Sequence, residues 1–339
     1  MKPLVLLLVS FLAALILTPL AKLIAGRFKI LDYPNKRKIH KTPVPLLGGV
    51  VVWASFLIAL LYAGPRQSEI KGLVLGGSLV MLVGLIDDIK GLSALFRLII
   101  QVIASVIIIK YGVCLSFFPP TLWGDMAEIS LTIFWVVGIT NALNFLDGLD
   151  GLATGISVIA LACFLVIAIL TGQPAIIALT LAALGACLGF LIYNLRPFNI
   201  FLGDAGSNFL GFILAGFAVL GDWAYNNEVA LVVPVLILGV PIFDVIFTTI
   251  MRVRNGDVKN FKEWLEYTGK DHFHHRLLDM GFSPLKATIF IYFVSLSLGI
   301  SAIVLLKAPL IHAILLLVQI SIIFILIAAL MVAGKKTTR

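Results

Sequence analysis

Apolar runs of roughly 20 residues follow one another along almost the whole chain, and each is long enough for a helix that crosses a bilayer. Of the 339 residues, 61% are hydrophobic and 12% are charged, which is typical of a polytopic membrane protein. We therefore predict an all-α fold with one integral membrane domain over residues 1–339. The first run is too long for a cleaved signal peptide and is kept as a helix. About eleven transmembrane helices are expected, near 3–25, 46–63, 72–88, 95–113, 128–146, 152–171, 174–193, 208–223, 228–248, 286–306 and 309–332.

Lysine and arginine are divided unequally between the two sides of this threading. Nineteen of the 25 fall on one side and five on the other, while Lys22 lies inside the first helix. Because positively charged loops stay in the cytoplasm, we predict an outside N-terminus, a cytoplasmic C-terminus and a location in the plasma (inner) membrane. The net charge of +8 then reflects topology, and no nucleic-acid partner is expected. The predicted cytoplasmic loops lie near 26–45, 87–95, 147–152, 194–207 and 249–286.

The polar clusters of the chain all fall on the predicted cytoplasmic side. A miscounted helix between any two of them would place them on opposite sides of the bilayer. Their agreement therefore indicates one shared functional site that faces the cytoplasm. The clusters are Asp87 with Asp88, Asp147 with Asp150, Asp204, and the histidines His272, His274 and His275.

A polar stripe at residues 141–151 interrupts the apolar pattern and ends in two Asp-Gly pairs. Asn141, Asn144 and Asp147 recur every third residue, so on a helix they share one broad face. Amides in a membrane helix can simply join helices, and for Asn141 that structural interpretation is as strong as a functional one. The two glycines are expected to end the helix and to place Asp147 and Asp150 on a turn. Two acids on a turn at a membrane surface favour a metal or phosphate site.

Further aspartates lie at the ends of two other predicted helices. Asp87 and Asp88 are adjacent, so their carboxylates repel each other unless a cation is near. A solvated helix end is the structural alternative, and a divalent metal is the functional one. Asp204 lies between two glycines just before a predicted helix, where backbone N–H groups favour an anion and the carboxylate offers hard oxygen to Mg²⁺. This combination predicts a metal-bound phosphate.

Three histidines crowd the longest polar loop, near 249–286. His272, His274 and His275 stand beside Arg276. Such a group can bind zinc, but neighbouring cysteine ligands are missing and the remaining acids prefer magnesium. A basic cradle that donates hydrogen bonds to a diphosphate is the preferred interpretation.

In this order the motifs resemble those of the polyprenyl-phosphate N-acetylhexosamine-1-phosphate transferases, of the bacterial undecaprenyl-phosphate GlcNAc-1-phosphate transferase type. That family is related to the phospho-muramoyl-pentapeptide transferases. The resemblance spans nearly the whole chain, and the order of the motifs carries it rather than any single one. The motifs lie at 32–34, 37–41, 43–49, 87–88, 141–151, 201–207, 241–244 and 272–277.

The resemblance implies transfer of an N-acetylhexosamine 1-phosphate from a UDP-sugar to undecaprenyl phosphate, with release of UMP and a requirement for Mg²⁺, for which Mn²⁺ can substitute. It implies that Asp87, Asp88 and Asp204 are catalytic, and that Asp204 and Asp88 bind the metal. The implied substrate-binding residues are Lys38, His40, Asn144, Asp147, Asp150, His272, His274, His275 and Arg276. UDP-N-acetylglucosamine is the favoured donor, N-acetylgalactosamine is the alternative sugar, and a homodimer is compatible with the sequence. The reaction would start a cell-envelope polysaccharide such as lipopolysaccharide or teichoic acid.

The chemistry of the acceptor agrees with this reaction. A phosphomonoester has a second pKa near ~6, so a lipid phosphate is largely dianionic at neutral pH and hardly needs a base. We therefore favour direct attack on the β-phosphorus of the donor over a covalent aspartyl-phosphate intermediate. Asp87 would position the acceptor or remove a residual proton.

Three other functions are weighed against this one. Phospho-muramoyl-pentapeptide transfer is less favoured, because the His-x-His-His pattern resembles the amino-sugar branch. A cation- or proton-coupled transporter would also combine many helices with acids, but transporter sites usually lie near the bilayer midplane. An intramembrane protease using Asp204 lacks a second acid at convincing membrane depth.

Overall fold

The computed structural model describes residues 3–34, 42–64, 67–195, 200–267 and 269–334. Within these residues the chain forms helices and one pair of two-residue antiparallel strands, β1 and β2. The elements are α1 (Leu4–Phe28), β1 (Leu31–Asp32), β2 (Val44–Pro45), α2 (Gly48–Ala63), α3 (Ser68–Lys90), α4 (Ala94–Lys110), α5 (Leu122–Leu146), α6 (Leu152–Thr171), α7 (Pro174–Asn194), α8 (Gly203–Leu220), α9 (Asn227–Ile237), α10 (Gly239–Asn255), α11 (Phe261–Glu266), α12 (Phe273–Asp279), α13 (Pro284–Val304), the 3-10 helix η1 (Leu305–Lys307) and α14 (Leu310–Gly334).

Every apolar segment predicted from the sequence lies on a helix, so the all-α prediction is confirmed. Among the described residues, eight helices are long and apolar enough to cross a bilayer, and nine spans result if the bent pair of α9 and α10 forms one. α2 and α4 have only 16 and 17 residues. The total of about eleven spans therefore stays a prediction, as does the orientation.

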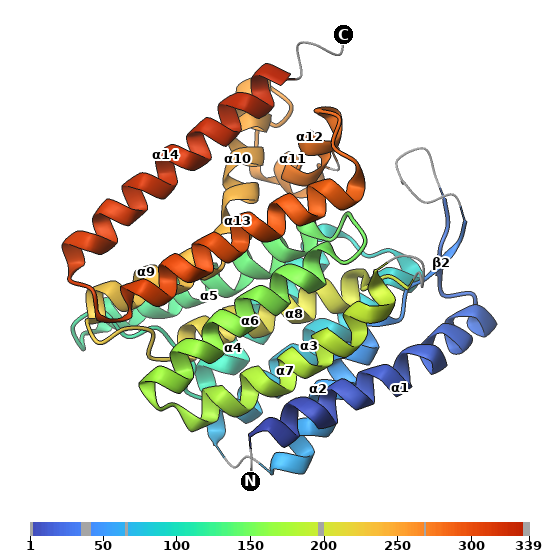
Figure 1. Cartoon of the computed structure of the whole chain (residues 1–339), viewed down its shortest axis with the longest axis horizontal. Helices are drawn as coiled ribbons and strands as arrows, with labels where there is room; N and C mark the ends of the chain where they lie inside the picture. The colour runs from blue at the N-terminus through green and yellow to red at the C-terminus, as the bar shows by residue number, and fades with distance from the viewer. Residues whose placement is uncertain (1–2, 35–41, 65–66, 196–199, 268, 335–339) are drawn as a thin grey trace.

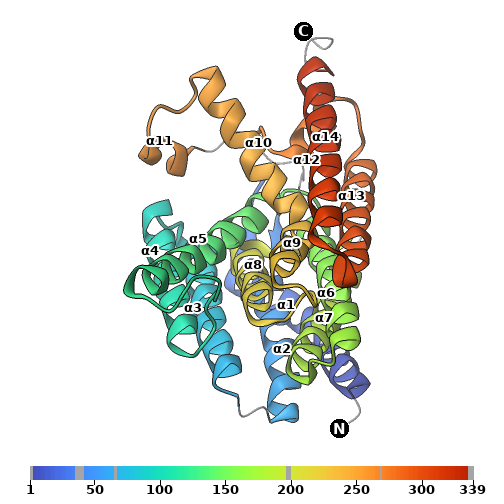
Figure 2. The ribbon, with the colours of Figure 1, turned by 90° about the vertical axis from the view of Figure 1, so that its left-hand side faces the viewer.

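The segment predicted as one helix near 228–248 is broken. α9 ends at Ile237 and α10 begins at Gly239, and the two are bent by 77° (Figure 2). Pro241 explains the break, because its nitrogen has no hydrogen to donate to the carbonyl of Ile237 and its ring would collide with that carbonyl. The prediction of one continuous helix was wrong at this point.

The outer helices have an exposed side and a packed side. α1 exposes large aliphatic side chains at every fourth position from Leu4 to Ile16. Its other side carries small buried residues such as Ala14 and faces α7, where a Cβ on Gly185 or Gly189 would overlap the α1 backbone. Close approach through small residues is a main source of helix association in lipid.

α8 lies at the centre of the bundle, against α2, α3 and α5, and most of its residues are buried. Glycines permit this depth, since a Cβ on Gly49 of α2 would overlap the backbone of Gly206. The most enclosed helix therefore begins at Gly203 and Asp204. The ends of neighbouring helices surround its first turn.

α10 has two unlike sides. Ile246, Ile250 and Val253 are exposed on one of them, whereas Asp244 and Arg252 are buried on the other. In Figure 2, α10 extends out of the bundle, and α11 and α12 lie with it at the end of the molecule opposite the N-terminus. The predicted polar loop 249–286 therefore contains the end of α10 and two short helices, and Figure 1 places β2 at the same end.

Candidate active site

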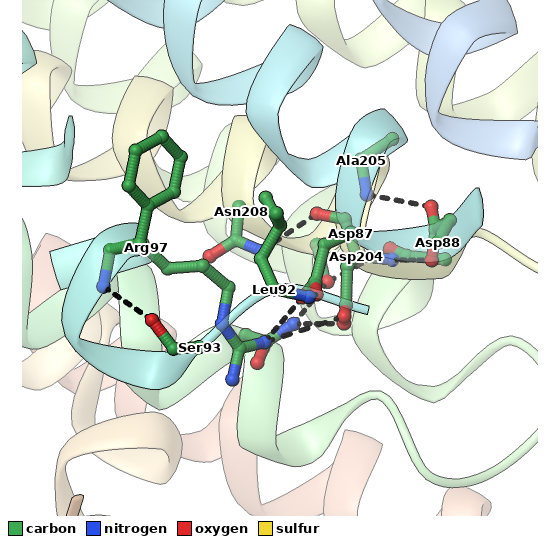
Figure 3. Close-up of polar contacts among 12 residues, drawn as sticks. Asp87, Asp88, Leu92, Ser93, Arg97, Asp204, Ala205 and Asn208 are labelled. Atoms are coloured by element: carbon green, nitrogen blue, oxygen red, sulfur yellow. Dashed lines mark hydrogen bonds and ion pairs between the residues drawn. The ribbon is translucent and has the colours of Figure 1, made fainter. Parts of the chain in front are cut away.

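Three aspartates from α3 and α8 meet where α3 ends and α8 begins (Figure 3). Asp88 accepts the backbone N–H groups of Asp204 at 2.9 Å and of Ala205 at 3.1 Å. Its carboxylate thus caps the first turn of α8, where unpaired N–H groups attract negative charge. Gly203 permits the approach, because its φ is +72° and a Cβ there would lie 2.6 Å from an Asp88 oxygen. Asp88 therefore fixes the backbone that carries Asp204.

Arg97, in the first turn of α4, joins the other two acids. Its Nη1 lies 2.7 Å from Asp87 Oδ2 and 3.5 Å from Asp204 Oδ2. Asp87 also accepts the backbone N–H of Leu92, which closes the turn between α3 and α4. No role at the site was predicted for Arg97 from the sequence, although a cation within a predicted span is itself a signal of function. One guanidinium thus bridges two carboxylates from different helices.

The polar stripe of α5 reaches the same cluster. Asn144 donates from Nδ2 to Asp204 Oδ1 at 2.7 Å and to the hydroxyl of Ser207 at 2.9 Å. The helix ends at Leu146, and Asp147 is its C-cap. The predicted helix end and turn are confirmed, and the structure brings Asn144 and Asp204 together.

Three buried or half-buried amides, which we call the amide ladder, cross the bundle behind Asn144. Asn141 donates to Gln101 at 2.6 Å, and Gln101 donates to Asn208 at 3.1 Å. Asn208 in turn donates to the backbone carbonyl of Asp204 at 2.7 Å. Amides that satisfy one another join helices. The ladder supports the structural interpretation of Asn141.

Asp147 and Asp150 lie on the turn between α5 and α6, which we call the aspartate turn (residues 147–151). Gly151 directly precedes α6 as its N-cap and has φ +73°, a left-handed conformation that glycine adopts without strain. Burial, followed by the negative charges of Asp204 and Asp150, raises the pKa of Asp147 to about 8. The turn therefore lies in a region of excess negative charge, which a bound cation would relieve.

We expect the stability of the ligand-free protein to fall as pH rises from about 4 to about 8. Asp147 keeps its proton in the folded state up to its pKa of about 8, whereas its ordinary value is 3.8. The folded state thus binds more protons than the unfolded chain in this window, so a rising pH favours unfolding. Asp147→Asn cannot ionise and should flatten the dependence. The measurement is Tm in detergent without Mg²⁺ from about pH 5 to about pH 9, and an unchanged slope in the variant would contradict the assignment.

The predicted histidine cluster lies on and beside α12. His272 precedes the helix, with Nδ1 2.7 Å from Asp244 Oδ2 and Nε2 3.2 Å from Arg252 Nη2. Arg276 donates from Nε to the backbone carbonyl of Asp271 at 2.8 Å. Both ring nitrogens of His272 therefore have protein partners. No role was predicted for Arg252 from the sequence, and Asp244 appeared there only within the motif at 241–244.

His274 brings α12 against the aspartate turn. A Cβ on Gly148 would overlap its Nε2, so two segments more than a hundred residues apart are in contact. His274 is 1% exposed, and neither of its ring nitrogens has a hydrogen-bond partner among the described residues. Burial, then the nearby His275 and His272, holds its pKa well below the usual value, so the ring is neutral. A buried imidazole with unmet donor and acceptor capacity is unusual in a folded protein, and a bound ligand would satisfy it.

Two predicted substrate-binding residues, Lys38 and His40, lie outside the described residues. The strands on either side of them pair, with Leu31 opposite Pro45. The backbone N–H of Phe201 donates to the carbonyl of Pro45 at 2.9 Å. This contact places the β1–β2 pair beside the turn that starts α8.

Comparison with known proteins identifies the family of the chain. The family described as glycosyl transferase family 4 matches residues 70–222. A Bacillus subtilis protein named a probable undecaprenyl-phosphate N-acetylglucosaminyl 1-phosphate transferase is 36% identical over 335 residues, which cover 97% of this chain and 90% of the relative. The chain belongs to glycosyl transferase family 4. The Mycobacterium tuberculosis protein named decaprenyl-phosphate N-acetylglucosaminephosphotransferase is 33% identical over 308 residues, which cover 80% of this chain and 74% of the relative. The Escherichia coli protein named undecaprenyl-phosphate alpha-N-acetylglucosaminyl 1-phosphate transferase is 28% identical over 284 residues, which cover 80% of this chain and 75% of the relative.

The family 4 match ends at residue 222, so it includes the acid cluster and leaves out α10 to α12. The fold nevertheless brings His274 of α12 against Gly148, inside the matched part. This family 4 transferase thus assembles its candidate active site from segments on both sides of that boundary.

Proposed function

We propose that this protein transfers N-acetylglucosamine 1-phosphate from UDP-N-acetylglucosamine to undecaprenyl phosphate, releasing UMP, at the cytoplasmic face of the plasma membrane. The observation that carries the proposal is the convergence of the acids of α3 and α8, the aspartate turn and the histidines of α12 at one end of an apolar bundle. A charged soluble donor and a lipid acceptor need such a place to meet. The names of the three relatives support the sugar and the lipid. The product would begin a cell-envelope polysaccharide.

We propose Mg²⁺ as the cofactor, because the donor set consists of hard carboxylate and amide oxygens. No group of three or more His, Cys, Asp or Glu ligands is preformed in the part of the chain that the structure describes. That suits magnesium, which is usually held by one or two carboxylates and completed by water and substrate phosphate. Asp204 is the better candidate ligand, because its side chain is 36% exposed. Asp88 is less suited, since its oxygens already accept two backbone N–H groups.

In the proposed reaction an oxygen of the lipid phosphate attacks the β-phosphorus of the donor. A new phosphorus–oxygen bond forms, and the bond from that phosphorus to the bridging oxygen breaks, so UMP leaves with the electron pair. Bound magnesium would screen the charge of the phosphates. Because the acceptor is largely dianionic at neutral pH, with a second pKa near ~6, the protein mainly has to align the two substrates.

Asp87 is better placed to position groups than to remove a proton. Its two carboxylate oxygens accept hydrogen bonds from the Leu92 N–H and from Arg97. Arg97 is 30% exposed and can turn part of its guanidinium toward a phosphate while it bridges Asp87 and Asp204. We assign the diphosphate of the donor to His274 and Arg276, and its nucleotide to Asn144 and the aspartate turn.

The test is UMP release by purified protein with Mg²⁺, undecaprenyl phosphate and a panel of UDP-sugars. The proposal expects release with UDP-N-acetylglucosamine and loss of activity with a chelator. Turnover only with UDP-N-acetylgalactosamine or UDP-muramoyl-pentapeptide would contradict the proposed donor. Ion-coupled uptake in sealed vesicles without any UDP-sugar, together with no UMP release, would support the transporter instead.

His274→Ala is expected to lower kcat/KM for UDP-N-acetylglucosamine roughly 10- to 100-fold, because it removes the imidazole that would form a hydrogen bond with the diphosphate. The apparent KM for undecaprenyl phosphate should move less than about twofold. His312→Ala, at an exposed position on α14, is the matched control and should behave as wild type. Normal donor kinetics in His274→Ala, or a loss of lipid affinity instead, would assign this histidine to a different role.

A further inference from the structure

Asp244 on α10 is a fully buried carboxylate that contacts the chain where α12 begins. Its Oδ1 accepts the backbone N–H of Phe273 at 2.6 Å, and the Thr248 hydroxyl lies 3.5 Å from the same oxygen. Its Oδ2 lies 2.7 Å from Nδ1 of His272. One side chain therefore holds both the first residue of α12 and the histidine before it.

The partners of His272 fix its protonation state. A carboxylate can only accept, so Nδ1 carries the hydrogen that faces Asp244. Arg252 can only donate, and its Nη2 lies 3.2 Å from Nε2. Nε2 must therefore be the acceptor, and the imidazole is neutral with its hydrogen on Nδ1. His272 is 8% exposed and has no nitrogen left for a substrate.

The chain of contacts continues to Arg276. Arg252 is buried and makes a bidentate pair with Asp271, from Nε at 2.7 Å and from Nη2 at 2.9 Å. This pair holds the pKa of Asp271 below its usual value, although burial alone would raise it. The backbone carbonyl of Asp271 then receives Nε of Arg276 at 2.8 Å. Asp244, His272, Arg252 and Asp271 thus form one connected series that ends at Arg276.

We propose that Asp244 is a positioning residue for sugar-phosphate transfer, which acts through His272 to hold α12 so that His274 and Arg276 face the donor diphosphate. The inference rests on the proposed function and changes the role of His272 from substrate ligand to support. Support of this kind matters, because a displacement of about 1 Å at a phosphate-binding group can cost on the order of 100-fold in rate. The break between α9 and α10 allows Asp244 to contact His272 and the first residue of α12.

Asp244→Asn tests the proposal, because it keeps the shape but offers His272 one oxygen and one NH₂ in place of two acceptors. We expect kcat/KM for UDP-N-acetylglucosamine to fall roughly 10- to 100-fold, with the apparent KM for undecaprenyl phosphate within about twofold of wild type. Asp257→Asn, an exposed acid just past the end of α10, is the matched control and should leave both constants unchanged. A change confined to the lipid KM, or equal losses in both variants, would overturn the proposal.

A second pair of variants separates positioning from substrate contact. His272→Asn keeps a donor close to the Nδ1 position, so it should retain about a third or more of wild-type kcat/KM, whereas His272→Ala should fall as far as Asp244→Asn. The double variant Asp244→Asn/His272→Ala should be no worse than either single one, because both break the same contact. Additive losses, or an inactive His272→Asn that is folded, would show that His272 meets the substrate itself.

A measurement without substrate keeps this inference separate from the proposed function. In protein labelled with ¹⁵N-histidine, the Nδ1–H tautomer of His272 should be present in wild type, and the shift of its Nδ1–H signal that marks the hydrogen bond to the Asp244 carboxylate should be lost in Asp244→Asn. If no UDP-sugar yields UMP but the Nδ1–H signal changes as expected, the proposed function fails and the contact stands. If His272 carries its hydrogen on Nε2 in wild type, the positioning role is wrong whatever the activity.

Discussion

Asp204→Asn is expected to reduce UMP release at least about 1000-fold while the protein stays folded. The amide keeps the shape of the side chain but removes the charge that would hold the metal. It also turns an NH₂ toward Asn144 or Arg97, which both donate to this carboxylate. The measurement is kcat in detergent at saturating donor, acceptor and Mg²⁺, with Tm as the check on folding.

Asp222→Asn is the matched control for that experiment. Asp222 is an exposed acid just beyond the other end of α8, so its loss should change kcat less than about twofold. Activity of Asp204→Asn above about a tenth of wild type at saturating Mg²⁺ would be incompatible with Asp204 as the principal metal ligand.

Arg97→Ala is expected to lower kcat/KM for undecaprenyl phosphate at least about 100-fold. The change removes the guanidinium that bridges Asp87 and Asp204, so their charges would repel each other and the incoming lipid phosphate. Arg97→Lys should be intermediate, because an ammonium is a point charge and cannot present the planar guanidinium fork to both acids. The measurement is the dependence of UMP release on the acceptor at a saturating donor concentration.

Arg254→Ala is the comparison for Arg97, since Arg254 is an exposed arginine in the last turn of α10. It should leave the acceptor dependence unchanged. Turnover of Arg97→Ala near the wild-type value, with Asp204→Asn inactive, would reduce Arg97 to a structural tie between α4 and its neighbours.

The polar stripe of α5 shows how far the sequence leads. Its three-residue spacing predicted a shared helix face, and the two glycines that follow correctly predicted a turn after Leu146. The spacing could not tell which amide on that face meets which partner. Asn144 reaches Asp204, sixty positions along the chain, whereas Asn141, one turn earlier, reaches Gln101 in the amide ladder. A binding residue and a packing residue therefore look alike until the neighbouring helices are in place.

Arg97 and Asp244 were given no role from the sequence for a related reason, although Asp244 ends the motif at 241–244. The contact of Arg97 with Asp204 spans 107 positions, and that of Asp244 with His272 spans 28. Hydropathy also hides the break at Leu238, because both halves of the segment are apolar and read as one span. Only the detailed effect of Pro241 on the preceding turn separates α9 from α10 and directs Asp244 toward the histidines.

α10 joins an exposed apolar side, with Ile246, Ile250 and Val253, to an inner side that holds Asp244 and Arg252. The acids of α3 and α8 lie within the bundle, whereas His272 is held by Asp244 and Arg252 of α10. Apolar side chains follow the hydrocarbon boundary, and a helix adjusts to a thicker or thinner bilayer by tilting. We therefore expect the thickness of the bilayer to affect how closely the histidines approach the acids. UMP release in vesicles of lipids with shorter and longer acyl chains would measure this effect.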